Sequence, residues 1–398
     1  MPRPRSDAVP RVPLYAIDRS GSRLSDTSPL VWRRPARYGT SALALPARYG
    51  DHREMRSTLA DELSRYPREP LTRTPTPLHQ LVHAGARLEM DLHLKRDDLT
   101  DLALGGDKPR KLEYEVARAR AAGATVLVTC GSAQSNHARL TTAAARRVGL
   151  KATVVLSNDE RRTFQGNLLA VYLMGADVRF ADVDDHWEIE GHAERVCDEL
   201  RSAGETPYYI PVSGSTPLSC LGYVRAGLEL AEQLAASGLT PAAVYTPFGT
   251  GGIFAGTLTA LRELDIDCPV VGISVNGDAE QCQANLDKWW TAIGELLDRD
   301  PDRPRGATEI HDEFVGRAYG DATEACLDAI LLMGETEGIL LDPVYSGKVF
   351  AALCAHRHEG RWPADQTVVM LHSGGTPALF AYEAELRAHL TKRGIDLP

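Results

Sequence analysis

Short apolar runs alternate with alanine-rich segments along most of this chain. Runs rich in β-branched residues occupy positions 125–129, 152–156, 270–273 and 367–371, and segments with helical periodicity follow them. Uninterrupted apolar runs are typical of parallel strands that are buried on both faces. The pattern therefore predicts an α/β protein in which helices cover both faces of a parallel sheet.

The regular pattern begins near Leu59. Residues 1–51 are rich in Pro, Arg and Ser and show no sustained period, which predicts an extended or partly disordered arm. We assign residues 1–58 to this N-terminal extension. Its arginines are also compatible with a transit peptide, but the interspersed prolines would interrupt a long amphipathic helix and make that the lesser alternative.

Length and charge narrow the class of protein. At 398 residues the chain is long enough for two domains, and its net charge of -10 argues against nucleic acid or an anionic membrane as the main partner. The seven cysteines are scattered and form no C-x-x-C pair, so they indicate neither a disulfide framework nor a zinc site. Apolar runs of membrane-spanning length and a secretory signal are both missing. We expect a cytoplasmic protein that acts on a small molecule and holds no metal.

A reactive amine is indicated by the segment Gly-Gly-Asp-Lys-Pro-Arg-Lys at 105–111. Glycines let another group approach the backbone closely, and a lysine crowded by other cations loses its proton more readily. This pattern favours a lysine that forms an imine, here Lys108. Taken alone, the same residues would also suit a solvated turn.

Three links between a predicted strand and the next helix carry unusual polar or glycine-rich sequences. Ligands of open parallel sheets bind outside the carboxyl ends of the strands, so these links are expected to converge. The first link, 130–137, precedes a helix predicted at 138–148 and offers several hydrogen-bonding side chains. A plain helix cap at Ser135 or Asn136 is the alternative interpretation.

The second link, Phe-Gly-Thr-Gly-Gly-Ile-Phe at 248–254, exposes backbone N–H groups at the start of a helix predicted at 255–264. It is suited to a phosphate group, although its glycine spacing matches neither an ATP nor a dinucleotide motif, and a tight turn without a ligand is the alternative. The third link, 372–377, has a similar form and precedes a helix predicted at 378–389. Upstream, 341–348 offers a further polar turn. Together with a reactive lysine, these loops describe a site for a phosphorylated carbonyl cofactor, and pyridoxal 5′-phosphate fits that description.

These motifs resemble those of the fold-type II pyridoxal-phosphate enzymes of the D-cysteine desulfhydrase and 1-aminocyclopropane-1-carboxylate (ACC) deaminase family. The similarity extends from about Leu59 to Tyr382, and its motifs lie at 95–98, 105–111, 134–137, 210–212, 221–223, 337–345 and 374–377. It implies two open, mainly parallel, twisted sheets flanked by helices, as in the β subunit of tryptophan synthase. It also implies a large cofactor-binding domain at 59–110 and 220–398, and a small α/β domain at 111–219.

The resemblance also implies roles for individual residues. Lys108 would form the Schiff base, Lys111 would help to hold the cofactor phosphate, and Asn136 would bind the ring hydroxyl and contact the substrate. The remaining roles fall on two groups of residues. The cofactor phosphate would be wrapped by Gly249, Thr250, Gly251 and Gly252, while the substrate would meet Ser135, His137, Tyr319 and Tyr345. Ser135, with its neighbour His137, would take the substrate carboxylate or assist proton transfer. For the two tyrosines, aromatic packing in the wall of the fold is the alternative.

Two positions bear on the choice within the family. ACC deaminases usually carry Glu after the tyrosine of the D-P-V-Y motif and Leu before the Gly-Gly loop, whereas this chain has Ser346 and Ser373. A neutral hydroxyl facing the cofactor ring nitrogen does not demand a protonated ring, which suits β-elimination better than the opening of a cyclopropane. His137 also agrees with desulfhydrases.

One departure from the family is Asp107, which stands where Asn usually precedes the Schiff-base lysine. Its carboxylate would either favour the protonated amine and retune the chemistry, or turn away to a structural partner such as Arg110. Both alternatives stay open at this point.

The resemblance implies a pyridoxal-phosphate-dependent lyase that acts by α,β-elimination on a small amino acid, most simply D-cysteine giving pyruvate, ammonia and sulfide. ACC deamination and a biosynthetic β-replacement are the alternatives on the same scaffold. A protein that binds the cofactor without turnover is the alternative from another class. The resemblance also implies a homodimer.

Overall fold

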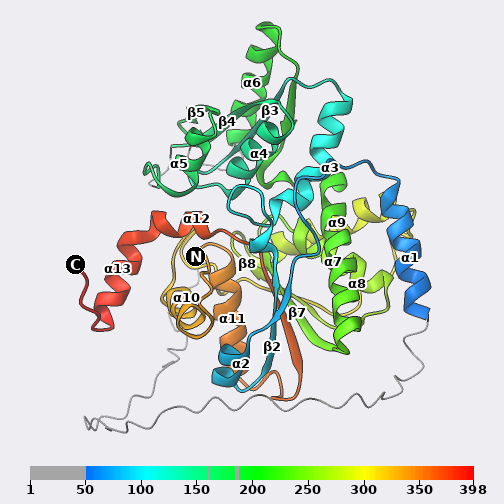
Figure 1. Ribbon diagram of the computed structural model, residues 1–398, viewed down its shortest axis with the longest axis vertical. Coiled ribbons are helices and arrows are strands. Elements are labelled where there is room, and N and C mark those ends of the chain that lie inside the picture. Colours follow the sequence, from blue (N-terminus) through cyan, green and yellow to red (C-terminus); the bar gives the residue numbers. More distant parts are fainter. Residues whose placement is uncertain (1–50, 159–160, 184–187) are drawn as a thin grey trace, which may run out of the picture.

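The computed structural model describes residues 51–158, 161–183 and 188–398. The N-terminal extension predicted from the sequence lies outside this range up to residue 50, and its last residues, 51–58, belong to helix α1 (Asp51–Ser64). The described residues form two open sheets with helices on both faces of each, so the predicted fold class is confirmed (Figure 1).

The larger sheet has six strands within the described residues, in the order β1-β2-β10-β7-β8-β9. Only β1 is antiparallel to its neighbour β2, and the other neighbouring pairs are parallel. The order is non-sequential because helices cross over between the strands. The strands are β1 (Leu78–Gln80), β2 (Asp91–Arg96), β7 (Pro241–Phe248), β8 (Val270–Ser274), β9 (Thr308–His311) and β10 (Thr367–His372).

Alternate side chains of the larger sheet fill two separate cores. Val244 of β7 packs with helices α7, α8 and α9 on one face, while its neighbour Tyr245 packs with α10 and α11 on the other. This alternation follows from the period of two along a strand. The helices around this sheet are α2 (Val82–Leu88), α7 (Pro217–Ser237), α8 (Gly252–Glu263), α9 (Ala279–Leu296), α10 (Glu324–Glu337) and α11 (Ser346–His358), with α1 beside α7.

The smaller sheet is fully parallel and has the order β5-β4-β3-β6 within the described residues. Leu127 of β3 packs against helices α3 and α4, whereas Val128 packs against α6 on the opposite face. The strands are β3 (Val126–Gly131), β4 (Lys151–Ser157), β5 (Asp177–Ala181) and β6 (Pro207–Ile210). The helices are α3 (Lys108–Ala121), α4 (Asn136–Arg147), α5 (Gly166–Leu173) and α6 (Glu188–Ser202).

The domain boundaries proposed from the sequence fall inside helices. The boundary at 58/59 divides α1, the one at 110/111 divides α3, and the one at 219/220 divides α7. Helices α3 and α7 pack against each other, and Figure 1 shows both near the junction of the two sheets. The junction is therefore built from continuous helices.

The prediction of one continuous helix at 378–389 is wrong. The chain there forms α12 (Thr376–Leu379), a 3-10 turn at Phe380–Tyr382 and then α13 (Glu383–Lys392). The break coincides with Tyr382, whose buried hydroxyl donates a hydrogen bond to Gly320 O at 2.8 Å and whose ring lies 3.6 Å from the Arg161 guanidinium. These tertiary contacts bind Tyr382 to two other segments, and a helical period in the sequence does not report them.

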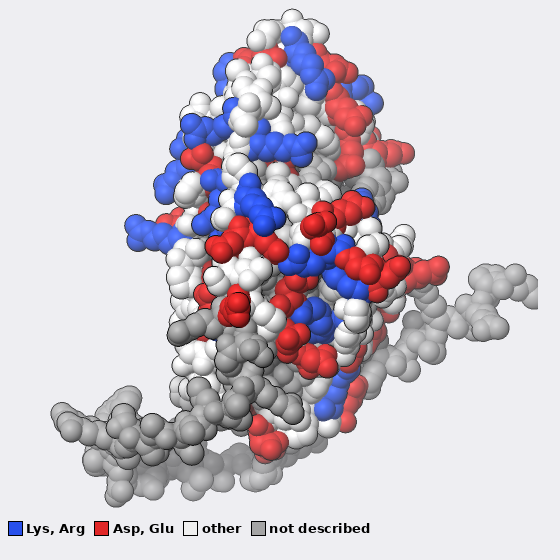
Figure 2. Space-filling model, turned by 90° about the vertical axis from the view of Figure 1, so that its right-hand side faces the viewer, with Lys and Arg blue, Asp and Glu red and all other residues white. Residues whose placement is uncertain are grey.

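In the described residues, no helix combines the length and the apolar character that a bilayer crossing requires. On the face shown in Figure 2, Lys and Arg side chains lie among Asp and Glu side chains.

Helices α3 and α7 approach closely at Gly222. A Cβ atom at this position would lie 2.2 Å from the carbonyl oxygen of Arg110, which is far inside van der Waals contact. Helix α10, on the other face of the larger sheet, contains Gly334, where a Cβ atom would meet nothing within 4 Å. Substitution of Gly222 therefore tests a steric requirement, whereas substitution of Gly334 tests helix propensity alone.

We expect Gly222→Ala to lower the free energy of unfolding by roughly 1–3 kcal/mol, because α3 and α7 must move apart. The matched control Gly334→Ala should raise it by about 0.5–1 kcal/mol, because alanine loses less backbone entropy in a helix. Urea unfolding of the two variants measures both values. Equal effects at the two positions would contradict the close approach.

Candidate active site

The loop that carries Lys108 is held in an unusual backbone conformation. Four consecutive residues, 103–106, have positive φ angles, and Lys108 then begins α3. At Gly105 the φ angle is 71° and a Cβ atom would lie 1.9 Å from Asp98 O, so this position requires glycine. Strain of this kind persists only where the surroundings enforce it.

Hydrogen bonds from both sheets enforce this loop. The Arg139 guanidinium, from α4 of the smaller sheet, donates a bond to Gly105 O at 2.9 Å. The Thr100 hydroxyl donates to Gly106 O at 2.6 Å, and Gly106 N donates to Thr100 Oγ1 at 2.9 Å. The Lys108 amine is therefore presented from a fixed position.

A pocket lies in front of this loop and brings together many of the predicted residues. Its lining comes from the start of α3, the loop after β6, the end of β7 with the following loop and the start of α8, and the residues next to α11 and β10. The lining residues are Asp107, Lys108, Lys111, Ser213, Pro247, Gly249, Thr250, Gly251, Gly252, Ile253, Tyr345 and Ser373.

One end of the pocket is built to hold an oxyanion. Lys111 Nζ donates a hydrogen bond to Ser215 Oγ at 2.7 Å, and Ser215 Oγ lies 2.6 Å from Thr250 Oγ1. Burial and the charge of nearby Lys108 lower the pKa of Lys111 to about 8. A buried ammonium with only hydroxyl and carbonyl partners is stabilised by any anion that enters.

The N-terminus of α8 completes this end. Its first residue is Gly252, its N-cap Gly251 has a φ of 86°, and no side chain caps it. A Cβ atom on Gly252 would lie 2.9 Å from Ser215 Oγ and 3.2 Å from Lys111 Nζ, so a larger residue would fill the cradle. Free backbone N–H groups, the helix dipole and the lysine thus face the same space, an arrangement that fits a phosphate group.

The amine of Lys108 is paired with its neighbour. Lys108 Nζ lies 2.5 Å from Asp107 Oδ2, and both side chains are buried. Arg110 is bonded instead to Asp97 and Glu229. Of the two alternatives for Asp107, the structure therefore shows the carboxylate at the amine and not at Arg110.

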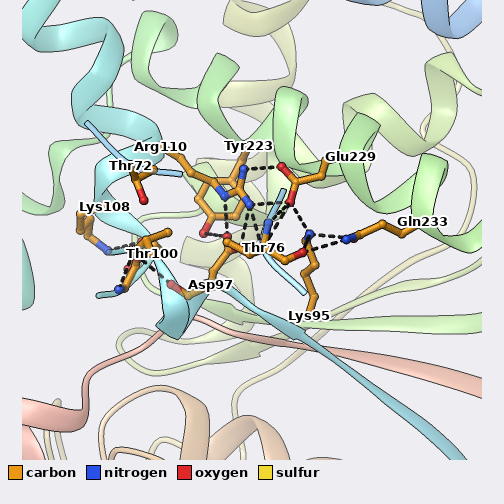
Figure 3. A network of polar contacts seen from close by, with 12 residues as sticks. Thr72, Thr76, Lys95, Asp97, Thr100, Lys108, Arg110, Tyr223, Glu229 and Gln233 are labelled. Atoms are coloured by element: carbon orange, nitrogen blue, oxygen red, sulfur yellow. Dashed lines mark hydrogen bonds and ion pairs between the residues drawn. The ribbon is translucent and has the colours of Figure 1, made fainter. Parts of the chain in front are cut away.

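A buried network of charges lies directly behind Lys108 (Figure 3). The Arg110 guanidinium donates to Asp97 Oδ2 at 2.8 Å and to Glu229 Oε2 at 3.0 Å, which links α3 to the end of β2 and to α7. The Tyr223 hydroxyl donates to Asp97 Oδ2 at 2.8 Å, and Lys95 Nζ is bonded to Glu229. The network holds the first turn of α3 in place.

Each charged group in this network stabilises the ionised form of its partners of opposite charge. Although burial opposes its charge, Asp97 and Glu229 raise the pKa of Arg110 well above its usual value. Burial likewise opposes ionisation of Asp97 and Glu229, but Arg110 lowers the pKa of both carboxyl groups. Burial lowers the pKa of Lys95, against the opposing effect of the two carboxylates.

The two predicted tyrosines contact each other, and of the two only Tyr345 belongs to the pocket lining. The hydroxyl groups of Tyr319 and Tyr345 are 2.7 Å apart, and Lys108 Nζ lies 5.9 Å from the centre of the Tyr345 ring. Burial, together with Tyr319, raises the pKa of Tyr345 well above its usual value. The Tyr345 phenol is therefore protonated at neutral pH.

The predicted residues Ser135, Asn136 and His137 lie at the start of α4, beside the pocket and outside its lining. The Ser135 hydroxyl accepts a hydrogen bond from Ala138 N at 3.1 Å and is the N-cap of α4, as the alternative interpretation expected. Asn136 Oδ1 accepts a bond from Asn167 Nδ2 at 2.8 Å. A helix N-terminus here offers a second place for an anion.

His137 is buried, and a Cβ atom on Gly214 would lie 2.6 Å from its Cε1 atom. Burial, with the charges of Lys108 and Lys111, lowers the pKa of His137 well below its usual value. Its imidazole is therefore neutral near pH 7.

The two serines that bear on the choice within the family are placed differently. Ser373 lines the pocket, and its carbonyl oxygen accepts a bond from Asp107 N at 2.9 Å. Ser346 is fully buried outside the lining, and its hydroxyl donates to Asp342 Oδ1 at 2.6 Å. Asp342 also accepts bonds from Val344 N and Tyr345 N, so its carboxylate fixes the start of α11.

Sequence reasoning missed two residues of the oxyanion end, Ser213 and Ser215. Ser213 has a φ of 63° and its carbonyl oxygen accepts a bond from Lys111 Nζ at 3.3 Å. The signal was the run Pro-Val-Ser-Gly-Ser at 211–215, which links a strand to a helix as the other site loops do.

Comparisons with known proteins show the family to which the chain is similar. Residues 70–374 match the family described as pyridoxal-phosphate-dependent enzymes. A D-cysteine desulfhydrase from Serratia proteamaculans is 35% identical over 335 residues, which cover 82% of this chain and 99% of that protein. A Pyrococcus abyssi protein, named provisionally as an ACC deaminase, is 36% identical over 326 residues, which cover 81% of this chain and 96% of that protein.

The same similarity appears in three dimensions. The crystal structure of an ACC deaminase homologue matches this fold with a TM-score of 0.77 at 35% sequence identity. The match covers 83% of this chain and 99% of the homologue.

We expect Lys111→Met to weaken binding of pyridoxal phosphate by roughly 10- to 100-fold, because one charged hydrogen bond contributes about 1.5–3 kcal/mol. Binding of pyridoxal, which lacks the phosphate, should change little. Titration of cofactor-free protein, followed by absorbance, measures both affinities. The exposed Lys151→Met is the control, and an equal loss for both ligands would contradict the assignment of Lys111 to the phosphate.

Proposed function

Because the chain belongs to the pyridoxal-phosphate-dependent enzymes, in the family of ACC deaminases and D-cysteine desulfhydrases, we propose that it catalyses α,β-elimination. The substrate is a small amino acid with a leaving group on Cβ, most simply D-cysteine, which gives pyruvate, ammonia and sulfide. The observation that carries the proposal is that three features line one pocket. They are the fixed amine of Lys108, the oxyanion cradle, and the neutral side chain of Ser373.

Pyridoxal phosphate, when bound, supplies an electron-withdrawing ring that stabilises negative charge at the substrate Cα atom. The protein supplies the attachment and the orientation. Lys108 is the amine that holds the cofactor aldehyde, and Lys111, Ser215 and the glycines of the 249–252 loop hold its phosphate. These groups come from α3, the loop after β6 and the start of α8, so three separate segments of the chain would hold the cofactor.

The substrate carboxylate is assigned to the N-terminus of α4. The Ser135 hydroxyl already accepts the bond from Ala138 N, so its own proton is available to a carboxylate oxygen. The helix dipole favours a negative charge at the same place. Neutral His137 adds no charge that would compete with the substrate amine.

Proton transfers are assigned to Lys108 and the tyrosine pair. Once its nitrogen is free, the Lys108 amine is the base for the α-proton, and Asp107 at 2.5 Å stabilises the ammonium that results. The phenol of Tyr345, which is protonated and bonded to Tyr319, can donate a proton to the thiolate as the C–S bond breaks.

Neutral side chains favour elimination over ring opening within this proposal. Both positions carry a hydroxyl group and no carboxylate: Ser373 lines the pocket, and Ser346 lies outside the lining, bonded to Asp342. ACC deamination remains the second candidate because a relative at 36% identity carries that name. A homodimer in the cytoplasm, as the family implies, is part of the same proposal.

The Schiff-base assignment predicts a spectroscopic change. Purified wild-type protein should show the visible absorbance band of a lysine-bound cofactor, and Lys108→Ala should lose that band while still binding the phosphate group. Absorbance spectra of both proteins after dialysis are the measurement. A band that persists in the variant would refute the role of Lys108.

Product assays test the reaction itself. D-Cysteine should yield pyruvate and sulfide in equal amounts, and ACC should yield little 2-oxobutyrate, because this chain has Ser346 where ACC deaminases usually carry Glu. A new thioether or amine adduct in the presence of a second nucleophile would instead support β-replacement. If no amino acid in a panel of D and L forms altered the cofactor spectrum, a binding protein without turnover would be the better description.

A further inference from the structure

A cluster of two histidines and a carboxylate lies at the edge of the larger sheet. His311 ends β9, Glu313 follows two residues later, and His356 lies in the last turn of α11. One potential ligand atom from each residue lies within 4.8 Å of the others. His356 is ten residues, or about 15 Å of helix, beyond Ser346 at the start of α11, so the cluster is distinct from the cofactor pocket.

The ring of His356 is held by a hydrogen bond on one side. Its Nδ1 atom lies 2.7 Å from the hydroxyl of Tyr245, which also accepts a bond from Trp362 Nε1 at 2.8 Å. His356 is buried, and Phe314 packs edge-on against its ring at 6.0 Å between centroids. These contacts engage Nδ1 and leave Nε2 as the nitrogen for a ligand.

The ring of His311 lies between two carboxylates. Its Nδ1 atom is 3.0 Å from Glu313 Oε1, and its Nε2 atom is 3.3 Å from Glu309 Oε2. The Arg361 guanidinium pairs with Glu309 and lies 3.4 Å from His311 Nε2. This positive charge is therefore on the Nε2 side of the His311 ring. The Nδ1 atom and the Glu313 carboxylate face each other on the other side.

We propose that His311 Nδ1, Glu313 and His356 Nε2 bind a divalent transition-metal ion, with zinc as the best fit. Two imidazole nitrogens and one carboxylate oxygen form a ligand set typical of zinc, with water in the fourth position. The outer contacts also fit, because metal-bound histidines usually bond their other ring nitrogen to a carboxylate or a similar group. Glu309 supplies this contact to His311 and Tyr245 supplies it to His356.

A divalent metal ion binds a histidine through a ring nitrogen that carries no proton. Burial and neighbouring His311 lower the pKa of His356 to about 4, so this ring is neutral at pH 7 and has one nitrogen without a proton. The side chain of Glu313 is 55% exposed, which gives an ion access from solvent.

The site joins two elements that are distant in the sequence. In the described residues, β9 is the edge strand of the larger sheet and pairs only with β8, while α11 packs on that sheet and carries Tyr345 and Ser346 at its other end. A metal ion would fasten the edge strand to this helix. The expected role is therefore structural, and the cofactor chemistry does not depend on it.

Zinc binding to untagged, chelator-treated, cofactor-loaded protein tests the proposal. Isothermal titration with zinc chloride, together with elemental analysis after dialysis, should give one zinc ion per chain. His311→Ala and Glu313→Gln should each weaken binding by about tenfold or more, because the first removes a ligand and the second replaces a charged carboxylate by a neutral amide. Zinc should raise the thermal midpoint of wild-type protein and leave that of His311→Ala unchanged.

The matched control is His358→Ala, an exposed histidine in the same helix turn as His356, which should keep the wild-type affinity. Glu313→Gln changes a half-exposed side chain, so it tests the site even if His311→Ala fails to fold. The cofactor absorbance should be the same in all of these proteins. Absence of a stoichiometric zinc ion, or equal affinity in wild-type and Glu313→Gln protein, would overturn the proposal.

Discussion

The ion pairs of Arg110 determine how Lys108 is presented to the pocket. This guanidinium is almost fully buried and bridges Asp97, at the end of β2, and Glu229, in the middle of α7. Removing one partner of such a group leaves an uncompensated charge in the interior, which typically costs about 3–5 kcal/mol. Since Arg110 lies two residues after Lys108, the same contacts that neutralise the guanidinium also fix the first turn of α3.

The pocket exists because α3 and α7 run between the two sheets. Lys108 and Lys111 come from the start of α3, while Ser213 and Ser215 come from the loop that leads into α7. The smaller sheet contributes Arg139, which holds the strained backbone at 103–106. The larger sheet contributes the α8 N-terminus and the Ser373 loop. The site is thus assembled at the junction, where ends of strands from both sheets meet.

Sequence reasoning succeeded where the signal was local. The buried strands, the glycine loop before α8 and the lysine motif each depend on neighbours along the chain, and the structure places these loops around one pocket. It failed where long-range contacts decide. The break at Tyr382 reflects contacts with Arg161 and Gly320, and the partner of Asp107 depended on Arg110 being engaged elsewhere. The histidine cluster was also unreadable, because His356 lies 43 positions after Glu313.

The pairing of Lys108 with Asp107 has a consequence for the working cycle. In the proposed reaction each turnover would free the nitrogen of Lys108, and its ammonium form would otherwise lie unsolvated near Lys111, which is also buried. Asp107 offers a counter-ion 2.5 Å away, so the amine can leave and return without recruiting water or moving the backbone. Asp107 would therefore serve as a fixed counter-ion at the position that the amine takes when it is released.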